Sequence, residues 1–463
     1  MSDLTLTASL SAGLIAAILS LLLDDTEATA VPNLPPGLPP VTSPAIDQFE
    51  VVAGDGDGTY IWNSWGLHQT RITRHADGAV RLIYNVRDAG GGDAWRLMKK
   101  QGEAGAWSLE ATGDKFDDAF LLRDPVSDRA HVITSPNSVR TVYSSPAFAP
   151  VVMPGAWPFS SNASRQYSGA GIGADGTLCF KGYEEAATSP VENLTTRVGY
   201  LCGKMSPAGT WTWNSKVERD IGPRYSYDYV FPGVQGGFNG FLATAQRDVH
   251  KIAAGWPNSL DNYIFDGVRF YKTGYASSAD WLQSEIVPQN PPSMTATVAP
   301  VQRQYDAYVD SQNRVTVISF REDPADATVR GFYVTVADMN GNVLLNKKWN
   351  LPTYGYVRLF ESASNKLWLL WSNSDASATQ IFLYPVTVAM APAFDLQIEA
   401  YTDLSSAAAP YRMRANVFLT VPRGGNQKNN FVDGLMVACG TSYPAACSGQ
   451  DKILYFRIRL PGS

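Results

Sequence analysis

Histidine and tyrosine side chains at two places in this sequence could carry out acid–base chemistry on a bound ligand. His68 stands directly before a run of alternating residues. A neutral imidazole there could act as a general base, because its reference pKa lies near neutrality. Tyr225, Tyr227 and Tyr229 are spaced two apart, so on a β-strand their rings would share one face and could stack on sugars or supply a phenol. The alternative is a tyrosine ladder that packs between sheets.

Arg247 is a candidate for binding an acidic group. It follows residues 240–245, which are apolar or small. A guanidinium buried at such a position needs a partner, because an unpaired buried charge is costly. It could hold a ligand carboxylate through two parallel hydrogen bonds. It could instead form a structural ion pair with Asp228 or Asp248.

The other motifs in the chain argue against a cofactor. His75 is expected to be exposed and structural beside the turn at residues 76–78, and His131 is expected to be structural within a strand. No Gly-rich phosphate loop, metalloprotease helix or nucleophile elbow occurs at a convincing position. Residues 54–58 resemble a fragment of a calcium loop without its other ligands. We expect no catalytic metal and no cofactor, while a structural Ca²⁺ or Zn²⁺ ion stays open.

These side chains must be positioned by a hairpin that returns along the chain. Two alternating runs around a polar turn begin near residues 68, 118, 167, 225, 304, 356 and 412. The spacing of about 50 residues is typical of propellers, and a second pair of runs follows each hairpin. The pattern predicts an all-β fold, a seven-bladed β-propeller of four-stranded blades. Six or eight blades, a β-sandwich and a β-helix are the alternatives.

The chain divides into three parts. Residues 1–30 hold an uncharged apolar segment, 4–23, which is long enough for a membrane-spanning helix or could be a cleaved signal peptide; a packed N-terminal helix is the alternative. Residues 31–47 form a Pro-rich linker. Residues 48–463 form the propeller, with a long inserted loop at about 251–300. We expect a secreted, periplasmic or cell-surface protein.

Composition and cysteines limit the partners and the compartment. The net charge of −6 does not indicate nucleic-acid binding, which needs a basic face. The four cysteines permit two disulfides in an exported protein. Cys179 and Cys202 fall on successive expected strands and could pair or remain buried thiols, and a bridge between Cys439 and Cys447 could close a short loop.

His68, the opening at residues 225–229 and Arg247 together resemble a known family. The match is to the bacterial-neuraminidase-repeat, or sialidase-like, propellers that include ulvan lyases and related rhamnose-glucuronate lyases. Some members have a second histidine where this chain has residues 84–86, Tyr-Asn-Val, and some hold zinc through histidines not evident among the four here.

The resemblance implies a polysaccharide lyase that cleaves a uronic-acid-containing glycan by β-elimination. Arg247 would neutralise the carboxylate and so acidify the C5 proton. His68 would remove that proton, and Tyr229 would act as acid or base. The sugars of a bound polysaccharide or oligosaccharide would be positioned by Gln69, Arg71, Arg224, Tyr225, Tyr227 and Arg303.

Two other functions fit the same scaffold. A glycoside hydrolase would need two carboxylates about 5 to 10 Å apart across a pocket, and Asp228, Asp248 and Asp306 are the candidates. A non-catalytic glycan-binding or structural propeller is the third reading, because fold alone does not imply function.

Overall fold

The computed structural model describes most of the chain after the Pro-rich linker. The described residues are 44–53, 66, 68–87, 93–114, 119–134, 140–154, 168–184, 196–233, 238–250, 263–288, 301–323, 326–352, 355–374, 379–389, 394–398, 400–408, 412–413, 417–439 and 452–460. The apolar segment 4–23 and Cys447 lie outside them. No helix among the described residues is long and apolar enough to cross a membrane.

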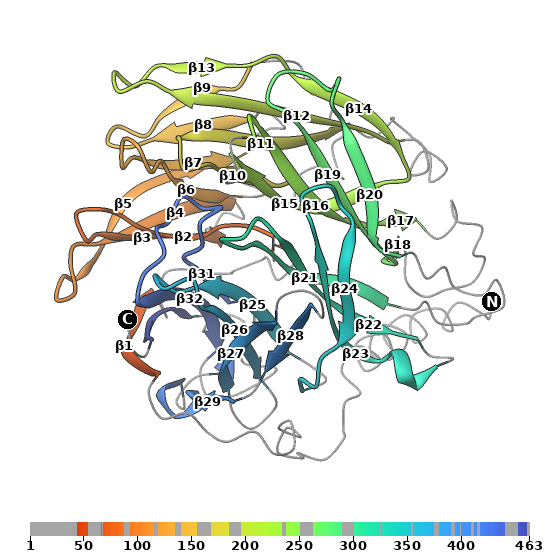
Figure 1. Ribbon diagram of the computed structural model, residues 1–463. Coiled ribbons are helices and arrows are strands. Elements are labelled where there is room, and N and C mark those ends of the chain that lie inside the picture. The colour runs from red at the N-terminus through yellow and green to blue at the C-terminus, as the bar shows by residue number, and fades with distance from the viewer. Residues whose placement is uncertain are drawn as a thin grey trace, which may run out of the picture.

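Seven antiparallel sheets follow one another around a ring, each with its first strand innermost (Figure 1). This confirms the predicted seven-bladed propeller. From the inner to the outer strand, blade 1 contains β2 (Ile72–Arg74), β3 (Val80–Arg87), β4 (Asp93–Lys100) and β5 (Trp107–Asp114), and blade 2 contains β6 (Phe120–Arg123), β7 (Ala130–Thr134), β8 (Thr141–Ser144) and β9 (Ala149–Val152). Blade 3 contains β10 (Ala170–Ile172), β11 (Thr177–Glu184) and β12 (Thr196–Met205), with β13 (Trp211–Trp213) and β14 (Val217–Gly222) beside β12. Blade 4 contains β15 (Tyr225–Pro232), β16 (Gly240–Arg247), β19 (Val268–Gly274) and β20 (Leu282–Val287).

Blades 5 to 7 complete the ring. They are β21 (Val301–Val309), β22 (Val315–Glu322), β23 (Gly331–Ala337), β24 (Val343–Lys348); β25 (Tyr356–Glu361), β26 (Leu367–Ser374), β27 (Thr379–Ala389), with β28 (Asp395–Ile398) and β29 (Thr402–Asp403) beside it; and β31 (Phe418–Leu419) with β30 (Arg412–Met413), β32 (Phe431–Cys439), β33 (Lys452–Arg459), β1 (Ala45–Ala53). Within the described part of the chain, the connections hold a two-stranded sheet, β17 (Val249–His250) with β18 (Tyr263–Ile264), and two 3-10 helices, η3 (Ala327–Val329) and η4 (Ser405–Ala408).

The ring closes by pairing the two ends of the described chain. β1 runs antiparallel to β33 and forms the outermost strand of blade 7, so the red strand lies among the blue ones in Figure 1. The pairing extends from Ala45, opposite Arg459, to Ala53, opposite Ile453. The backbone hydrogen bonds of the last blade therefore join the first and last strands of the propeller.

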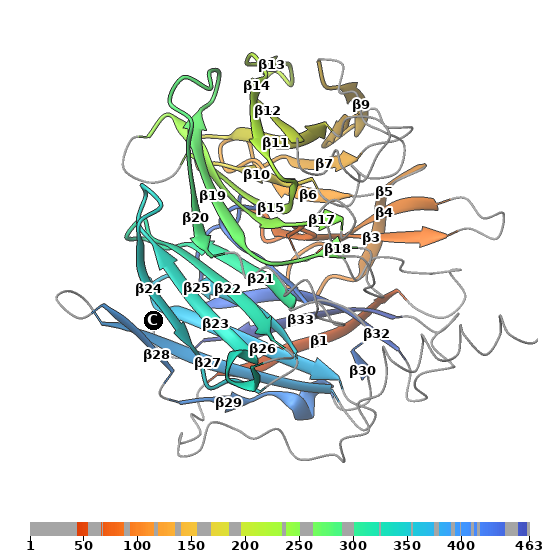
Figure 2. The same cartoon turned by 90° about the vertical axis from the view of Figure 1, so that its right-hand side faces the viewer.

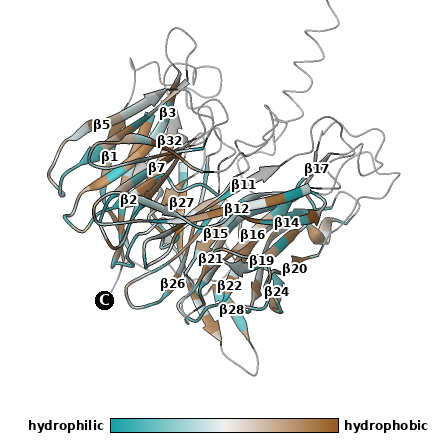
Figure 3. Ribbon diagram, turned by 90° about the horizontal axis from the view of Figure 1, so that it is seen from above, coloured by the Kyte–Doolittle hydropathy of each residue, from teal (hydrophilic) through white to brown (hydrophobic). Residues whose placement is uncertain are grey.

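Apolar side chains pack between neighbouring blades rather than within one central core. Each sheet buries both faces, so apolar residues line the strands while the turns are more hydrophilic (Figure 3). Between blades 4 and 5, for example, Phe270 and Ile286 pack against Val315 and Val317. Burial of this kind contributes about 25 cal/mol per Å² of apolar surface, and in this ring it fixes each inner strand against the next.

A segment of blade 7 crosses the ring and closes its centre. Residues 421–426, which we call the axis plug, follow β31 and reach blades 2 and 3. The amide of Ile172 donates to the carbonyl of Arg423 (2.9 Å), and the amide of Arg123 donates to the carbonyl of Gly424 (2.9 Å). The plug thus links blade 7 to blades 2 and 3 across the ring. These contacts lie at the back end of the axis, which is the end where the inner strands finish.

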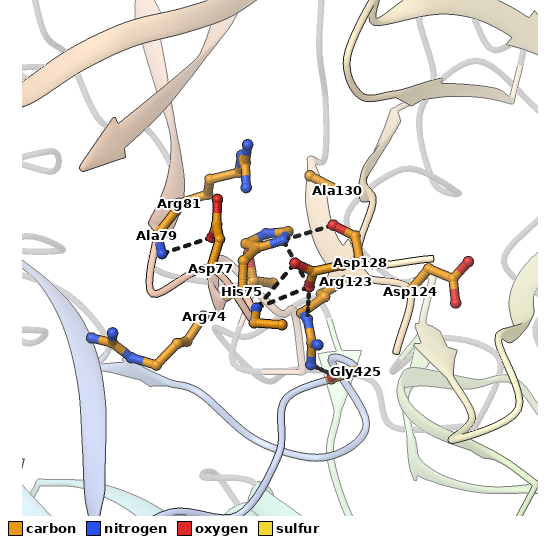
Figure 4. Close-up of polar contacts among 12 residues, drawn as sticks. Arg74, His75, Asp77, Ala79, Arg81, Arg123, Asp124, Asp128, Ala130 and Gly425 are labelled. Carbon is orange, nitrogen blue, oxygen red and sulfur yellow. Dashed lines mark hydrogen bonds and ion pairs between the residues drawn. The ribbon is translucent and has the colours of Figure 1, made fainter. Parts of the chain in front are cut away.

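His75 is buried, which corrects the expectation that it is exposed. Its side chain is 3% exposed, and its Nδ1 lies 2.9 Å from the carbonyl oxygen of Asp128 (Figure 4). Arg123 pairs with the same Asp128 and donates to the carbonyl of Gly425 (Figure 4). Burial, together with the nearby Arg81, lowers the pKa of His75 to about 4. The turn after β2 is therefore fastened to blade 2 and to the axis plug.

The segment expected to be a long inserted loop contains two strands of blade 4. β19 and β20 lie within residues 251–300 and form the outer half of that blade, in the order β15-β16-β19-β20. The extra residues that lengthen this repeat therefore lie partly before β19, around β17 and β18, and partly after β20.

Cys179 and Cys202 form a disulfide within blade 3. They lie directly opposite each other on β11 and β12, so the alternative of two buried thiols is wrong. Structural disulfides persist in oxidising compartments, which is consistent with an extracellular location. Cys439 lies at the end of β32, and its expected partner lies outside the described residues.

Replacing Cys179 and Cys202 together by alanine is expected to lower the free energy of unfolding by about 3 kcal/mol. The bridge joins residues 23 apart, and a loop of this length restricts the unfolded chain by about that amount. Urea unfolding measures the loss. A reducing agent should lower the stability of the wild type at least as much, and more than it lowers that of the double variant; equal midpoints for the oxidised wild type and the double variant would contradict the prediction.

Candidate functional site

His68 lies at the front end of the axis, where the inner strands begin. Its Nε2 is 2.6 Å from the carbonyl oxygen of Ser168, which precedes β10 of blade 3. Its ring lies edge-on to Phe120 of blade 2, at 6.0 Å between centroids, and to Tyr227 of blade 4, at 5.6 Å. The segment before β2 therefore brings this histidine from blade 1 into contact with three other blades.

His68 is held as a neutral imidazole. The side chain is fully buried, and burial together with the positive charges of Arg423, Lys181 and Arg71 lowers its pKa to about 3. A neutral ring bonded through Nε2 to a carbonyl must carry its proton on that nitrogen. Nδ1 then presents a lone pair, and it has no hydrogen-bond partner among the described residues.

Tyr227 is raised out of the regular strand by a β-bulge. The pairing of β15 with β16 shifts between Ser226, opposite Gln246, and Tyr229, opposite Thr244. Tyr227 sits in the bulge with φ +60° and is half-buried. A non-glycine residue with this φ is strained and is held by its surroundings. The bulge breaks the expected shared face of the three tyrosines and presents the Tyr227 ring to His68.

Asp266 is a titratable group at the front end that sequence reasoning missed. Arg247 donates through Nη1 to both oxygens of Asp266, at 2.7 Å each, so its partner is neither Asp228 nor Asp248. Burial outweighs the arginine and raises the pKa of Asp266 to about 6. A carboxyl that titrates near neutrality is typical of functional sites.

Phe265 connects the front-end groups of blades 4 and 5. Its ring lies 6.2 Å from that of Tyr227, and the guanidinium of the exposed Arg303 lies 5.2 Å from its centroid. Its carbonyl accepts from the amide of Gln302 at 2.7 Å. The front end thus brings together His68 and Tyr227. Phe265 links them to Arg303. Asp266, the partner of Arg247, directly follows Phe265 in the chain.

Three of the other predicted residues lie in the interior of blade 4. Tyr229 is fully buried and donates from its hydroxyl to the carbonyl of Tyr305 (2.9 Å), and burial raises its pKa. The Tyr225 hydroxyl donates to Glu285 at 2.7 Å. Arg224 pairs with Asp248 at 2.5 Å, with both side chains about 1% exposed. These side chains already have partners inside the protein.

Gln69 and Arg71 lie beside the axis but bind each other. Arg71 donates to Gln69 Oε1 from Nε (2.9 Å) and Nη2 (2.5 Å). Its guanidinium lies 5.3 Å from the centroid of the Phe418 ring of blade 7. Both side chains are about 2% exposed, so they support the centre of the ring.

The carboxylates considered for hydrolysis are all buried and engaged. Asp228 binds Lys181 Nζ at 2.5 Å and accepts from the Tyr200 hydroxyl at 2.6 Å. Asp248 binds Arg224, and Asp306 accepts from the amide of Leu359 at 2.7 Å. These three carboxylates offer no pair that faces a pocket.

The back end of the axis carries a separate cavity of about 440 Å³. It is lined by the turns that follow β10, β15 and β21 and by the axis plug. Arg423 separates it from the front end, since its Nη1 donates to the carbonyl of His68 at 2.6 Å. Among the described residues, no group of three or more His, Cys, Asp or Glu side chains could hold a metal ion.

Comparison with known proteins shows the fold. No family model matches the sequence, bacterial-neuraminidase repeats included, and no curated protein matches it. The polysaccharide lyase Uly1 has a TM-score of 0.50 at 10% identity, over 90% of this chain and 100% of that one. An ulvan lyase of family PL25 has a TM-score of 0.48 at 11% identity, over 87% and 94%. The GH93 α-L-arabinofuranosidase of Fusarium graminearum has a TM-score of 0.43 at 9% identity, over 89% and 98%.

The chain is therefore a seven-bladed β-propeller. The polysaccharide lyase Uly1 shares this fold at a TM-score of 0.50. Identities near 10% carry the comparison no further than the fold.

Proposed function

We propose that the protein is a carbohydrate-active propeller, a polysaccharide lyase that cleaves a uronic-acid-containing glycan at the front end of the axis. The observation that carries the proposal is the contact between Tyr227 and His68: a half-buried phenol on a strained bulge stands edge-on, at 5.6 Å, to a buried neutral imidazole. Propellers of this architecture include polysaccharide lyases.

Tyr227 is the group that would touch the substrate. Tyr227 reacts as the phenolate, after its own proton is lost to solvent: its oxygen takes the C5 proton, the released electron pair forms the C4–C5 double bond, and the C4–oxygen bond breaks. The same hydroxyl then returns the proton to the leaving oxygen. Tyr229 was the first candidate from the sequence, but its hydroxyl is occupied by the carbonyl of Tyr305.

His68 would act through Tyr227 as a positioning residue. It is fully buried, so a glycan does not reach it past the surrounding rings. Its Nδ1 has no described partner and can accept a hydrogen bond. A low pKa keeps the ring neutral across the ordinary pH range, so this acceptor persists in weak acid.

Arg303 and Arg247 supply the positive charge for the uronate. Arg303 is exposed beside Phe265. Arg247 shares its charge with Asp266, and a substrate carboxylate bound there would favour the protonated form of Asp266. Neutralising the carboxylate acidifies the C5 proton, which is the electrostatic part of the catalysis.

Replacing Tyr227 by phenylalanine is expected to lower the rate of product formation by at least about 100-fold, the usual contribution of a positioned acid–base group. The protein is incubated with alginate, polygalacturonate, hyaluronan and a sulfated rhamnose–glucuronate polymer, and the ultraviolet absorbance of unsaturated uronates is followed.

The matched control is Tyr333→Phe. Tyr333 is a tyrosine of blade 5 whose hydroxyl donates to the carbonyl of Thr328, away from His68 and Tyr227, so loss of this hydroxyl should leave the rate unchanged. Reducing ends without the ultraviolet signal would identify a hydrolase, and retention on a glycan column without turnover would identify a binding protein. Either result, or equal rates for Tyr227→Phe and the wild type, would refute the lyase proposal.

A further inference from the structure

Arg321 of blade 5 is a nearly buried cation that has no acidic partner among the described residues. It is 7% exposed. Its described contacts are neutral: Nε donates to the hydroxyl of Ser319 (3.3 Å), and Nη2 donates to the hydroxyl of Thr335 (3.2 Å) and to Oδ1 of Asn346 (2.9 Å). The ring of Tyr333 covers the guanidinium at 4.2 Å.

Burying such a charge without a counter-charge is unfavourable. Desolvation lowers the pKa of Arg321 to about 10, and only Tyr333 opposes that shift. Some arginines buried in the propeller have a carboxylate partner, as Arg224 has Asp248 and Arg457 has Asp433, whereas Arg423 donates to the backbone carbonyls of His68 and Gln69. A buried cation is normally paired, so an anion from outside the chain would complete this site.

Strand pairing gathers a second cation on the same face. Ser319 lies opposite Tyr333, which lies opposite Lys348. Lys348 belongs to β24, the outer strand of blade 5 (Figure 2). Lys348 is exposed, and its Nζ donates to the carbonyl of Thr328 at 3.1 Å.

Glycine at position 331 leaves room for the Lys348 side chain to lie against the strand that pairs with Arg321. Gly331 lies opposite Arg321 and has φ +137°, and a side chain there would collide with the Lys348 stem, whose Cε lies 2.8 Å from the position of a Cβ. The outer strand leaves the site accessible, because Asn346 and Lys348 are both exposed.

Acidic residues near this face are engaged elsewhere. Glu322 lies 3.7 Å from Arg330. Asp326 caps the 3-10 helix η3 by accepting from Thr328, and Lys348 is the cation that contributes to its lowered pKa.

We propose that Arg321 and Lys348 form an oxyanion-binding site on the outer half of blade 5, which takes the carboxylate or sulfate group of an acidic ligand. Arginine suits such groups, because its planar donors match two oxygens at once. The site is independent of the reaction proposed at the front end, so either can fail without the other.

Calorimetric titration of the full chain with sodium sulfate and, separately, with sodium glucuronate at constant ionic strength tests the site. We expect saturable binding with a Kd of the order of millimolar, as suits one exposed cluster of charge. Binding of sulfate alone would identify a sulfate ester as the ligand group, and binding of glucuronate would identify a carboxylate. No saturable heat with either anion would overturn the proposal.

Two variants and one control locate the binding. Arg321→Gln should abolish it. Asn346→Asp places a carboxylate 2.9 Å from Nη2, so it should weaken anion binding at least about tenfold by supplying the missing counter-charge, and it should raise Tm. The control Arg330→Gln removes a half-buried arginine of the same blade and should bind as the wild type. Wild-type affinity in Asn346→Asp would overturn the proposal even if Arg321→Gln fails to fold.

Discussion

Replacing Gly425 by alanine is expected to destabilise the propeller by about 2–5 kcal/mol, because the axis plug has no room for a methyl group. A Cβ at this position would stand 1.6 Å from the carbonyl oxygen of Arg123, and φ is +81°. The left-handed backbone costs an L-residue about 1–2 kcal/mol, and overpacking against a fixed backbone adds about 1–3 kcal/mol. The plug must move away from blade 2, which breaks the hydrogen bond from the Arg123 amide.

Gly78 provides a matched control for this prediction. It also has φ +81°, but no atom lies within 4 Å of the position of its Cβ. Gly78→Ala therefore carries only the backbone cost of about 1–2 kcal/mol. Urea unfolding of the two variants separates the two contributions. An equal loss of stability in both would show that close packing of the plug contributes nothing to the fold.

The architecture was predictable from the sequence because its signals are local. Alternation with a period of two, together with Gly, Asn and Asp in the turns, depends only on neighbouring residues. Copies such as Thr177–Glu184 and Val315–Glu322 became the second strands of blades 3 and 5. The pairing of Cys179 with Cys202 was one of two alternatives, and the strand register decided between them.

The outer half of blade 4 was wrongly predicted to be a loop, because the prediction used only the distance in sequence between successive hairpins. The surplus after the fourth hairpin was assigned as one loop at 251–300, although residues 268–274 and 282–287 form β19 and β20. Chain around the small sheet β17–β18 separates the halves of this blade. An insertion inside a blade and an insertion after a blade lengthen the spacing between hairpins equally.

The candidate site was only partly predictable because it depends on register and on distant contacts. Alternation placed Tyr225, Tyr227 and Tyr229 on one face, and a bulge overturned that placement, since one extra residue reverses every later side chain. The partner of Arg247 is Asp266, in a segment read as a loop. Arg423, which reaches His68 from blade 7, follows no repeat signal.

The polar groups at the axis of this propeller come from two segments that each extend from their own blade to other blades. The segment that begins at His68 and leads into β2 brings His68 from blade 1 to blades 2, 3 and 4, while the axis plug brings Arg423 from blade 7 to the same centre. These two segments meet at the His68 carbonyl and concentrate positive charge around a neutral imidazole. The repeat supplies the frame, and the departures from it supply the polar groups.

Replacing Lys181 by methionine is expected to lower the free energy of unfolding by about 3–5 kcal/mol, because it leaves Asp228 as a buried charge without its cation. Both side chains are 0% exposed, and Nζ lies 2.5 Å from Oδ1 of Asp228 and 2.7 Å from the carbonyl of Tyr225. This pair joins blade 3 to the strand that carries Tyr227. Its loss should therefore also loosen the bulge and slow any reaction at the front end.

The pH dependence of this variant identifies the cause. Burial already raises the pKa of Asp228, and Lys181 opposes that shift, so removing the lysine raises the pKa further. A carboxyl with a raised folded pKa makes the folded state more stable as the pH falls, because the folded state then binds the proton more tightly than the unfolded chain. The deficit in unfolding free energy of Lys181→Met relative to the wild type should thus shrink between pH 7 and pH 5.

Adding Asp228→Asn to Lys181→Met should recover most of the stability at pH 7, since the amide keeps an acceptor for Tyr200 without the charge. A deficit that stays constant with pH and persists in the double variant would assign the loss to packing rather than to the unpaired carboxylate.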